Sequence, residues 1–147
     1  MSVDRDLSFD LHALTARLDR SADRILRAEH DLSYRRFLTL VIVADLDAAT
    51  QRAVAEKLGV SEPSMSRMTA VLVAAGLLDA EPDPAGGNRR RLSLTLPGKH
   101  VVEQDRELLE RRFASLVERS GVPYGEYATH TKQLMAALDE AEKKANR

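Results

Sequence analysis

The sequence predicts a mainly α-helical (α+β) fold in which one short β hairpin lies between helices. Two neighbouring segments, 50–58 and 61–75, carry apolar residues at helical spacing, with only a glycine turn between them. Two short runs of strand character follow, and the chain on both sides of this region returns to helical spacing. With 147 residues, of which 44% are hydrophobic, the sequence predicts a single folded domain over residues 1–147.

Two helices are predicted before this region, because apolar residues recur there at intervals of three and four. The stripe of the first helix consists of Leu11, Leu14, Leu18, Ala22 and Ile25. The stripe of the second consists of Tyr34, Phe37, Leu38, Val41 and Ile42. Neither segment has the strict alternation of a half-buried strand.

The segment 50–58 has the signals of a short helix with defined ends. Thr50 is a suitable N-cap, and Val54 and Leu58 lie four residues apart on one face. Gly59 tolerates the left-handed backbone conformation that ends a helix, and the side chain of Val60 is expected to pack into the core and anchor the turn.

A second helix is predicted from Ser61, a suitable N-cap, with Pro63 in its first turn. The expected buried face consists of Met65, Met68, Leu72 and Ala75. The expected outward residues are Ser64, Ser66, Arg67 and Ala70. Small hydroxyls and one arginine at the start of a helix allow close approach to a DNA groove, although an ordinary solvated helix face has the same composition.

A β hairpin is predicted from residues 77–81 and 91–95, with Leu92 and Leu94 pointing inward. The turn formers at 82–88 make its tip. Between Pro84 and Lys99 there are four basic residues and no acidic one, while the whole chain has a formal charge of −1. This concentration of positive charge suits phosphate or the minor groove, although arginine runs also occur as solvated surface.

The end of the chain is predicted to form two further helices. Val102, Leu109 and Leu116 recur seven residues apart in the first, and Gly121-Val122-Pro123 then interrupts the helix. The last helix carries Tyr127, Leu134, Leu138 and Ala141. These helices have more apolar surface than one small domain covers, so they pair across a two-fold axis or pack back on their own domain.

The order and spacing of these segments resemble the multiple antibiotic resistance regulator (MarR) family of bacterial transcription factors over nearly the whole chain. The resemblance rests on Gln51 to Gly59 with Val60-Ser61, Ser64-Met65-Ser66-Arg67, Ala75-Gly76-Leu77-Leu78 and Leu94-Thr95-Leu96-Pro97-Gly98. It implies a winged helix-turn-helix over 33–98 with a two-stranded β wing, and a homodimer formed by helices at 5–31 and 98–145. The implied function is that of a repressor bound to palindromic double-stranded DNA, because two-fold related helices one turn apart read a palindrome.

The expected DNA-binding residues lie in the helix-turn-helix and the wing. They are Gln51, Ser61, Pro63, Ser64, Ser66, Arg67, Asn88, Arg89, Arg90 and Arg91. The chain departs from the family in the wing, where Gly86-Gly87-Asn88 replaces the usual Asp-x-Arg signature and Ala80 replaces an arginine. Arg89 and Arg90 are the natural substitutes.

The resemblance also implies release from DNA by a small aromatic or phenolic effector bound between the dimerisation helices and the winged domain. His30, Tyr34 and Phe37 cluster near the start of the second helix and are the candidate ligand-binding residues. The alternative is that both aromatic residues belong to the core and that His30 is a solvated helix end.

Other function classes have little support in the sequence. The absence of cysteine excludes disulfides and thiol-based sensing, and the four histidines lack the spacing of a metal site. No phosphate loop or nucleophile motif is present, so no catalytic residue, enzymatic activity or cofactor is expected. No membrane span or signal peptide is recognisable, which predicts a cytoplasmic protein. The remaining alternative function is a winged-helix module that binds another protein.

Overall fold

The computed structural model describes residues 6–46, 49–87 and 89–147. It confirms the predicted mainly α-helical fold with one two-stranded antiparallel sheet. The elements are α1 (Leu7–His30), α2 (Tyr34–Asp45), α3 (Gln51–Leu58), α4 (Glu62–Ala74), β1 (Leu78–Pro82), β2 (Arg90–Leu94), α5 (Leu96–Ser120) and α6 (Tyr124–Ala145). The chain forms two compact units, residues 1–105 and 106–147.

A side chain of α1 fixes the start of α2. The Asp23 carboxylate accepts a hydrogen bond from the backbone N–H of Tyr34 at 2.9 Å and another from Nε of Arg27 at 2.8 Å. These two hydrogen bonds, with the Tyr34 bond the stronger cause, lower the pKa of the Asp23 carboxyl. The first N–H groups of a helix have no partner within that helix, so Asp23 caps α2 from another element, beside the local cap Ser33.

The predicted ends of the two short helices are confirmed. Thr50 Oγ1 accepts a hydrogen bond from the N–H of Ala53 at 3.1 Å, and Ser61 Oγ accepts one from the N–H of Ser64 at 3.3 Å. Gly59 has φ of +69°, which supplies the left-handed turn between α3 and α4. Pro63 lies in the first turn of α4.

The buried face of α4 differs from the prediction at one end. Met65 and Leu72 are buried and Met68 is half-buried, but Ala75 is exposed because the helix ends at Ala74. Thr69, which was not predicted, is also buried, since it lies four residues after Met65 and three before Leu72 on the same face. In α1 the buried residue is Leu26, whereas Leu11 and Leu14 of the predicted stripe are exposed.

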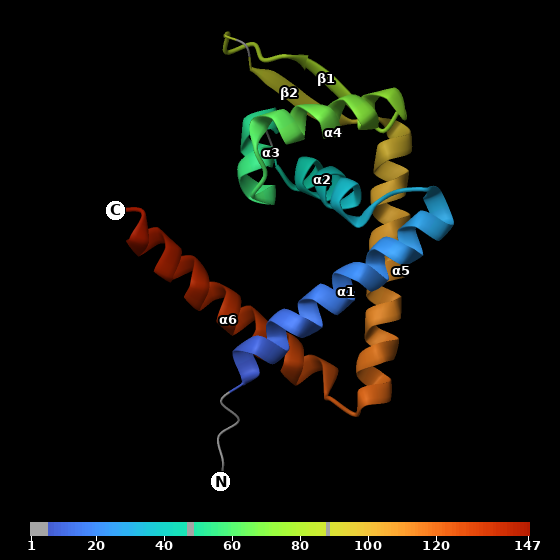
Figure 1. The fold of residues 1–147 in the computed structure, drawn as a ribbon, viewed down its shortest axis with the longest axis vertical. Helices are drawn as coiled ribbons and strands as arrows, with labels where there is room; N and C mark the ends of the chain where they lie inside the picture. The colour runs from blue at the N-terminus through green and yellow to red at the C-terminus, as the bar shows by residue number, and fades with distance from the viewer. Residues whose placement is uncertain (1–5, 47–48, 88) are drawn as a thin grey trace. The chain divides into compact units, whose positions relative to one another are not determined.

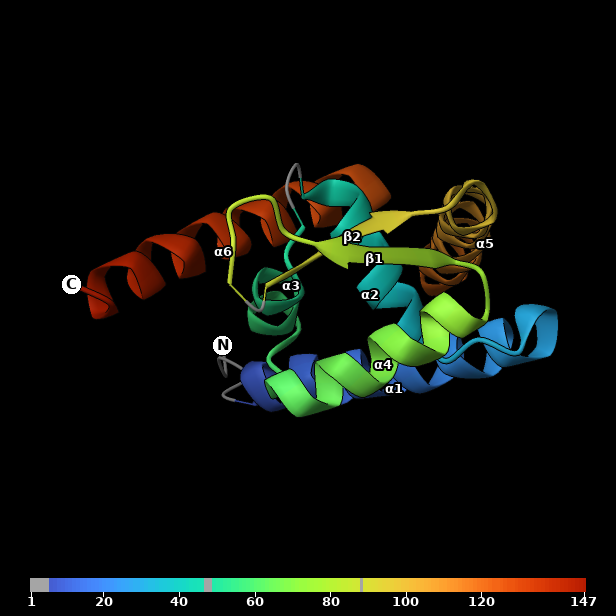
Figure 2. The ribbon, with the colours of Figure 1, turned by 90° about the horizontal axis from the view of Figure 1, so that it is seen from above.

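The hairpin is antiparallel, with Leu78 opposite Leu94 and Ala80 opposite Leu92. Both strands lie one residue away from their predicted positions. Leu77 still donates its N–H to the Leu72 carbonyl oxygen at the end of α4, and Thr95 already belongs to the start of α5. β1 contacts α4, and β2 contacts α2 and α3. The hairpin therefore runs along α4, with its tip at the end where α4 begins (Figures 1 and 2).

Thr95 joins α5 to the end of α4. Its hydroxyl donates to the Gly76 carbonyl oxygen at 2.6 Å and accepts from the N–H of Gly98 at 3.1 Å. Gly98 is buried, and a β-carbon there would overlap the carbonyl oxygen of Leu77. Only glycine therefore allows this close approach between the first turn of α5 and the residue before β1.

The second compact unit contains the rest of α5, a turn at Gly121 with φ of +78°, and α6. The predicted break at Gly121-Val122-Pro123 is confirmed, because α6 begins directly after Pro123. Leu134, Met135 and Leu138 of α6 are 63%, 61% and 59% exposed. Among the described residues, no helix has both the length and the apolar character of a membrane span.

Candidate nucleic-acid interface

The start of α4 presents a connected set of polar side chains. Ser61 Oγ donates to Ser64 Oγ at 3.0 Å, and a guanidinium nitrogen of Arg67 donates to Ser64 Oγ at 3.3 Å. Ser66 and Arg67 are exposed, as predicted, whereas Ser64 is half-buried. The Ser64 hydroxyl thus orients the Arg67 guanidinium at the solvent-facing start of the helix.

Gln51 and Pro63, the other expected contacts in this region, differ in exposure. Pro63 is exposed in the first turn of α4. Gln51 is the first residue of α3 and is half-buried, and its side-chain Oε1 is buried without a hydrogen-bond partner among the described residues. The Gln51 carbonyl oxygen is therefore turned away from solvent.

Two arginines of α2 join this surface, and the sequence analysis missed them. Arg35 and Arg36 line a surface cavity of about 290 Å³ together with Arg67 and Ser64. The apolar part of its lining comes from Val60, Met68 and Val71. Three arginines thus line one cavity beside α4. The adjacent pair Arg35-Arg36 was visible in the sequence, but helical periodicity alone does not reveal which helix an exposed side chain will meet.

The wing carries the remaining expected contacts. Arg89, Arg90 and Arg91 are exposed, and Asn88 lies outside the described residues. The tip is shaped by Asp83, whose N–H donates to the Arg89 carbonyl oxygen at 2.9 Å and whose carboxylate accepts from the N–H of Ala85 at 3.1 Å. The backbone hydrogen bond from Asp83 therefore positions Arg89 at the end of the hairpin.

The wing is also attached to the start of α3. Thr50 and Arg91 form an isolated antiparallel bridge, and the N–H of Leu92 donates to the Ala49 carbonyl oxygen at 2.7 Å. Leu92 and Ala49 are both buried. The base of the wing and the first short helix are therefore held together by main-chain hydrogen bonds and apolar contact.

The three candidate ligand-binding residues have different surroundings. The rings of Tyr34 and Phe37 stack with centroids 6.3 Å apart, and Phe37 is buried. His30, in contrast, places Nε2 at 3.0 Å from Oδ1 of Asp105, whose side chain is only 1% exposed. His30 is thus engaged by a carboxylate of α5, and its role in ligand binding stays a prediction.

Asp105 is a third residue that was not expected from the sequence. Burial raises the pKa of its carboxyl, and the opposing effect of His30 is smaller. Its Oδ2 has no hydrogen-bond partner among the described residues. The sequence signal was its position three residues after Val102 and four before Leu109, which places a carboxyl group on the apolar stripe of α5.

Comparisons with known proteins agree with this geometry. A family model described as the MarR family matches residues 30–87. A relative described as an uncharacterized HTH-type transcriptional regulator of Mycobacterium leprae (strain TN) is 32% identical over 119 residues, which cover 81% of this chain and 80% of the relative.

Two solved structures share the fold. The MepR–DNA complex of S. aureus has a TM-score of 0.73 and 21% identity, and the match covers 92% of this chain and 97% of that one. The complex of NadR with 4-hydroxyphenylacetate has a TM-score of 0.74 and 20% identity, with 94% and 95% covered. At these identities the likeness shows the fold.

Proposed function

Since this chain belongs to the MarR family of transcriptional regulators, we propose that it acts as a homodimeric repressor in the cytoplasm. In this proposal it binds a palindromic operator and is released by a small-molecule effector. The observation that carries the proposal is that three arginines line one cavity beside α4 together with Ser64, in a chain whose formal charge is −1. Such clustering favours phosphate binding, because local charge governs the attraction to DNA.

We assign separate roles to the residues of this surface. Ser64 and Ser66 approach the base edges of the major groove, since small hydroxyl groups allow a helix to lie deep in it. Arg67, with Arg35 and Arg36 beside it, neutralises phosphates. Arg89, Arg90 and Arg91 extend the contact to the next stretch of backbone or the minor groove.

Dimerisation is proposed for the terminal helices. Leu7 and Phe9 of α1 are 59% and 75% exposed, and α6 has no buried residue. Large apolar side chains that are exposed in this way indicate a surface that is covered by a binding partner. A second copy would supply it and would place two recognition helices for a palindromic site.

The effector is proposed to be a small aromatic or phenolic acid, and the NadR complex with 4-hydroxyphenylacetate supports this class through a shared fold. An effector that binds more tightly to the conformation that cannot bind DNA would shift the protein to that conformation and so release the operator. A transcription-regulator family is not an enzyme class, and no catalytic role is proposed.

The first test is selection of genomic DNA fragments by the purified protein at about 150 mM salt, where non-specific phosphate contacts are weakened. Enrichment of a short inverted repeat is expected. Failure to enrich any sequence would contradict operator binding and would direct the search to a protein partner.

The second test assigns the residues. Arg67→Ala and Arg36→Ala should each weaken binding to all sequences and reduce the slope of log affinity against log salt by about 0.9, the change expected per phosphate contact. Fluorescence anisotropy between about 50 and 200 mM salt measures this slope. Lys143→Ala at the end of α6 is the control, because it removes the same charge far along the sequence from this surface. Equal slopes in all three variants would refute the assignment.

A further inference from the structure

One of the two charged residues of α4 is acidic. The helix sequence from Glu62 to Ala74 contains Glu62 and Arg67 and no other charged residue. Glu62 is the first residue of the helix, its side chain is 68% exposed, and it is not among the DNA contacts expected from the sequence. A carboxylate at the start of a helix that is proposed to enter a DNA groove calls for an explanation, because the phosphates of DNA carry the same sign of charge.

Glu62 lies on the flank of α4 away from the cavity that the three arginines line. Ser64, Met68 and Val71 follow one another at intervals of four and three residues, and all three line that cavity. Glu62 does not line it and shares the other flank with the exposed Ser66, four residues later. The arginine-lined cavity and the Glu62 carboxylate are therefore on different flanks of the helix.

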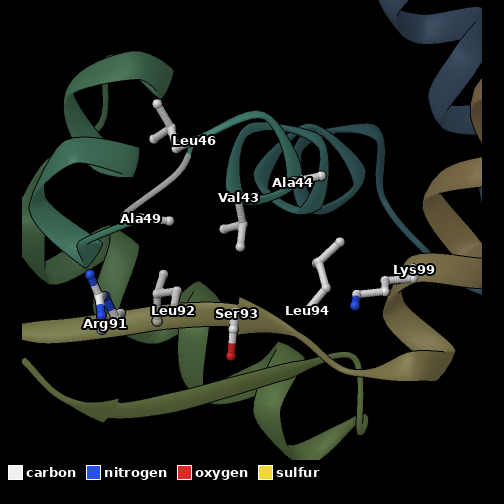
Figure 3. Close-up of a pocket in the computed structure, with 9 residues that line it drawn as sticks. All are labelled: Val43, Ala44, Leu46, Ala49, Arg91, Leu92, Ser93, Leu94 and Lys99. Carbon is white, nitrogen blue, oxygen red and sulfur yellow. The ribbon is translucent and has the colours of Figure 1, made fainter.

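The positive charge beside Glu62 comes from α3 and is shared between two carboxylates. Arg52 Nε lies 4.0 Å from Glu62 Oε1 and 3.6 Å from Glu56 Oε1. All three side chains are at least 66% exposed, so these ion pairs are weak. Arg91 of the wing, beside Leu92, lines a separate cavity between α2 and β2 to which Glu62 does not contribute (Figure 3). Glu62 therefore presents a solvent-facing carboxylate whose charge one shared guanidinium does not cancel.

An ionised carboxylate only accepts hydrogen bonds, and this limits what Glu62 can meet in the groove. Phosphates offer no donor, and neither do guanine N7 and O6 or thymine O4. The donors of the major groove are the amino groups of adenine and cytosine. Adenine carries the acceptor N7 beside its amino group, whereas cytosine presents its N4 amino group without a neighbouring acceptor. Cytosine is therefore the base that a carboxylate at this place would recognise.

We propose that Glu62 determines base specificity by accepting a hydrogen bond from the N4 amino group of a cytosine in the operator. This proposal rests on the DNA-binding function proposed above, in which α4 lies in the major groove and its N-terminal residues contact base edges. The arginines supply affinity for any duplex. Glu62 lowers the affinity for every site that lacks cytosine at this position, and specificity arises from that difference.

The test compares the sequences that the wild-type chain and Glu62→Gln select from random DNA duplexes. The wild-type chain should enrich an inverted repeat with a fixed C·G pair in each half-site. Glu62→Gln should accept adenine there as well, because glutamine pairs with adenine N6 and N7, and its preference for cytosine on matched duplexes should fall about tenfold. Fluorescence anisotropy measures this preference. Retention of the full preference in Glu62→Gln would overturn the proposal.

The affinity for a duplex without the repeat separates base reading from a role in the helix. An acidic residue in the first turn also stabilises a helix through its dipole. Loss of that role alone would weaken DNA binding or leave it unchanged. Removal of a carboxylate that faces DNA should instead strengthen binding to this duplex by about twofold to fivefold, the range for one exposed charge. Weaker binding of Glu62→Gln to this duplex would contradict the proposal.

Two further variants make the test specific. Glu62→Asp keeps the charge and its interaction with the helix dipole but shortens the side chain by one methylene group, so it should lose most of the preference for cytosine. An unchanged preference in Glu62→Asp would refute the direct contact. Glu56→Gln removes the same charge from the other partner of Arg52 and should retain the preference. An equal loss in Glu62→Gln and Glu56→Gln would mean that Glu62 acts through Arg52 and not on the base.

Failure of this proposal and failure of the proposed function give different results. A repeat selected by the wild-type chain without a fixed C·G pair would refute the role of Glu62 alone. A wild-type chain that selects no sequence would refute the proposed function and the role of Glu62 with it. Circular dichroism of each variant before selection verifies that it is folded.

Discussion

Replacement of Gly98 by alanine tests the junction at which α5 begins. The added β-carbon would overlap the Leu77 carbonyl oxygen and lie 3.3 Å from Thr95 Oγ1. That carbonyl oxygen accepts the N–H of Thr95 at 3.2 Å, so it is held in place from the other side. The atoms in conflict belong to the backbone and not to the end of a flexible side chain, and the first turn of α5 must therefore move.

The cost follows from three contributions. Overpacking in a closed site costs about 1–3 kcal/mol, and loss of the Thr95–Leu77 hydrogen bond costs about 1 kcal/mol more. Alanine regains at most about 1 kcal/mol through its helix propensity. The net effect is a destabilisation of about 2 kcal/mol, which lowers Tm by roughly 4–8 °C in a chain of this size.

The assay is urea and thermal unfolding followed by circular dichroism at one fixed protein concentration, because association makes apparent stability depend on concentration. Gly125→Ala is the matched control, since a β-carbon there has no heavy atom within 4 Å and the residue belongs to α6. It should leave stability unchanged or raise it by up to about 1 kcal/mol. If Gly98→Ala proves as stable as the control, the close approach of Leu77 and Gly98 is wrong.

Two further predictions concern α5 and α6. Burial raises the pKa of Asp105 above its ordinary value of 3.8. Between the pKa of the unfolded chain and that of the folded chain, the folded chain holds a proton that the unfolded chain has lost, so the free energy of unfolding falls as pH rises through this range. Asp105→Asn should remove this decline and be the more stable protein at neutral pH, as urea unfolding at a series of pH values would show; parallel curves would contradict the burial argument. Leu134→Asp should give a monomer or an unfolded chain by light scattering, because it places a charge in the proposed apolar seam. Ala136→Asp, on the opposite side of the same helix, should remain dimeric, and a dimer in both variants would refute the seam.

The features of the fold that were predicted correctly from the sequence depend on interactions between residues only a few positions apart in the chain. Thr50 and Ser61 cap their helices by accepting the N–H three residues ahead, and Gly59 ends α3 through its own backbone angle. Such signals are local, and their spacing in the sequence is sufficient to place them.

The parts that sequence missed depend on packing between elements. Thr69 lies on the buried face of α4 between Met65 and Leu72, whereas Ala75 follows the last residue of the helix and is exposed. Arg36 and Arg67 line the same cavity although they belong to different helices, and His30 meets Asp105 across 75 positions of sequence. Helical periodicity identifies the faces of a helix but not the partner of each face.

The hydrogen bond from the Tyr34 N–H to Asp23 couples the start of α2 to α1. Arg35 and Arg36 directly follow the residue whose N–H is held by the α1 carboxylate. Hydrogen bonding from the Tyr34 N–H and from Arg27 lowers the pKa of that carboxyl and so favours its ionised, hydrogen-bond-accepting form. If a second copy of the chain tilted α1, the connection through Asp23 would displace Arg35 and Arg36 as well. A change at the proposed dimer contact would then reach the proposed phosphate-binding surface without any rearrangement of α4.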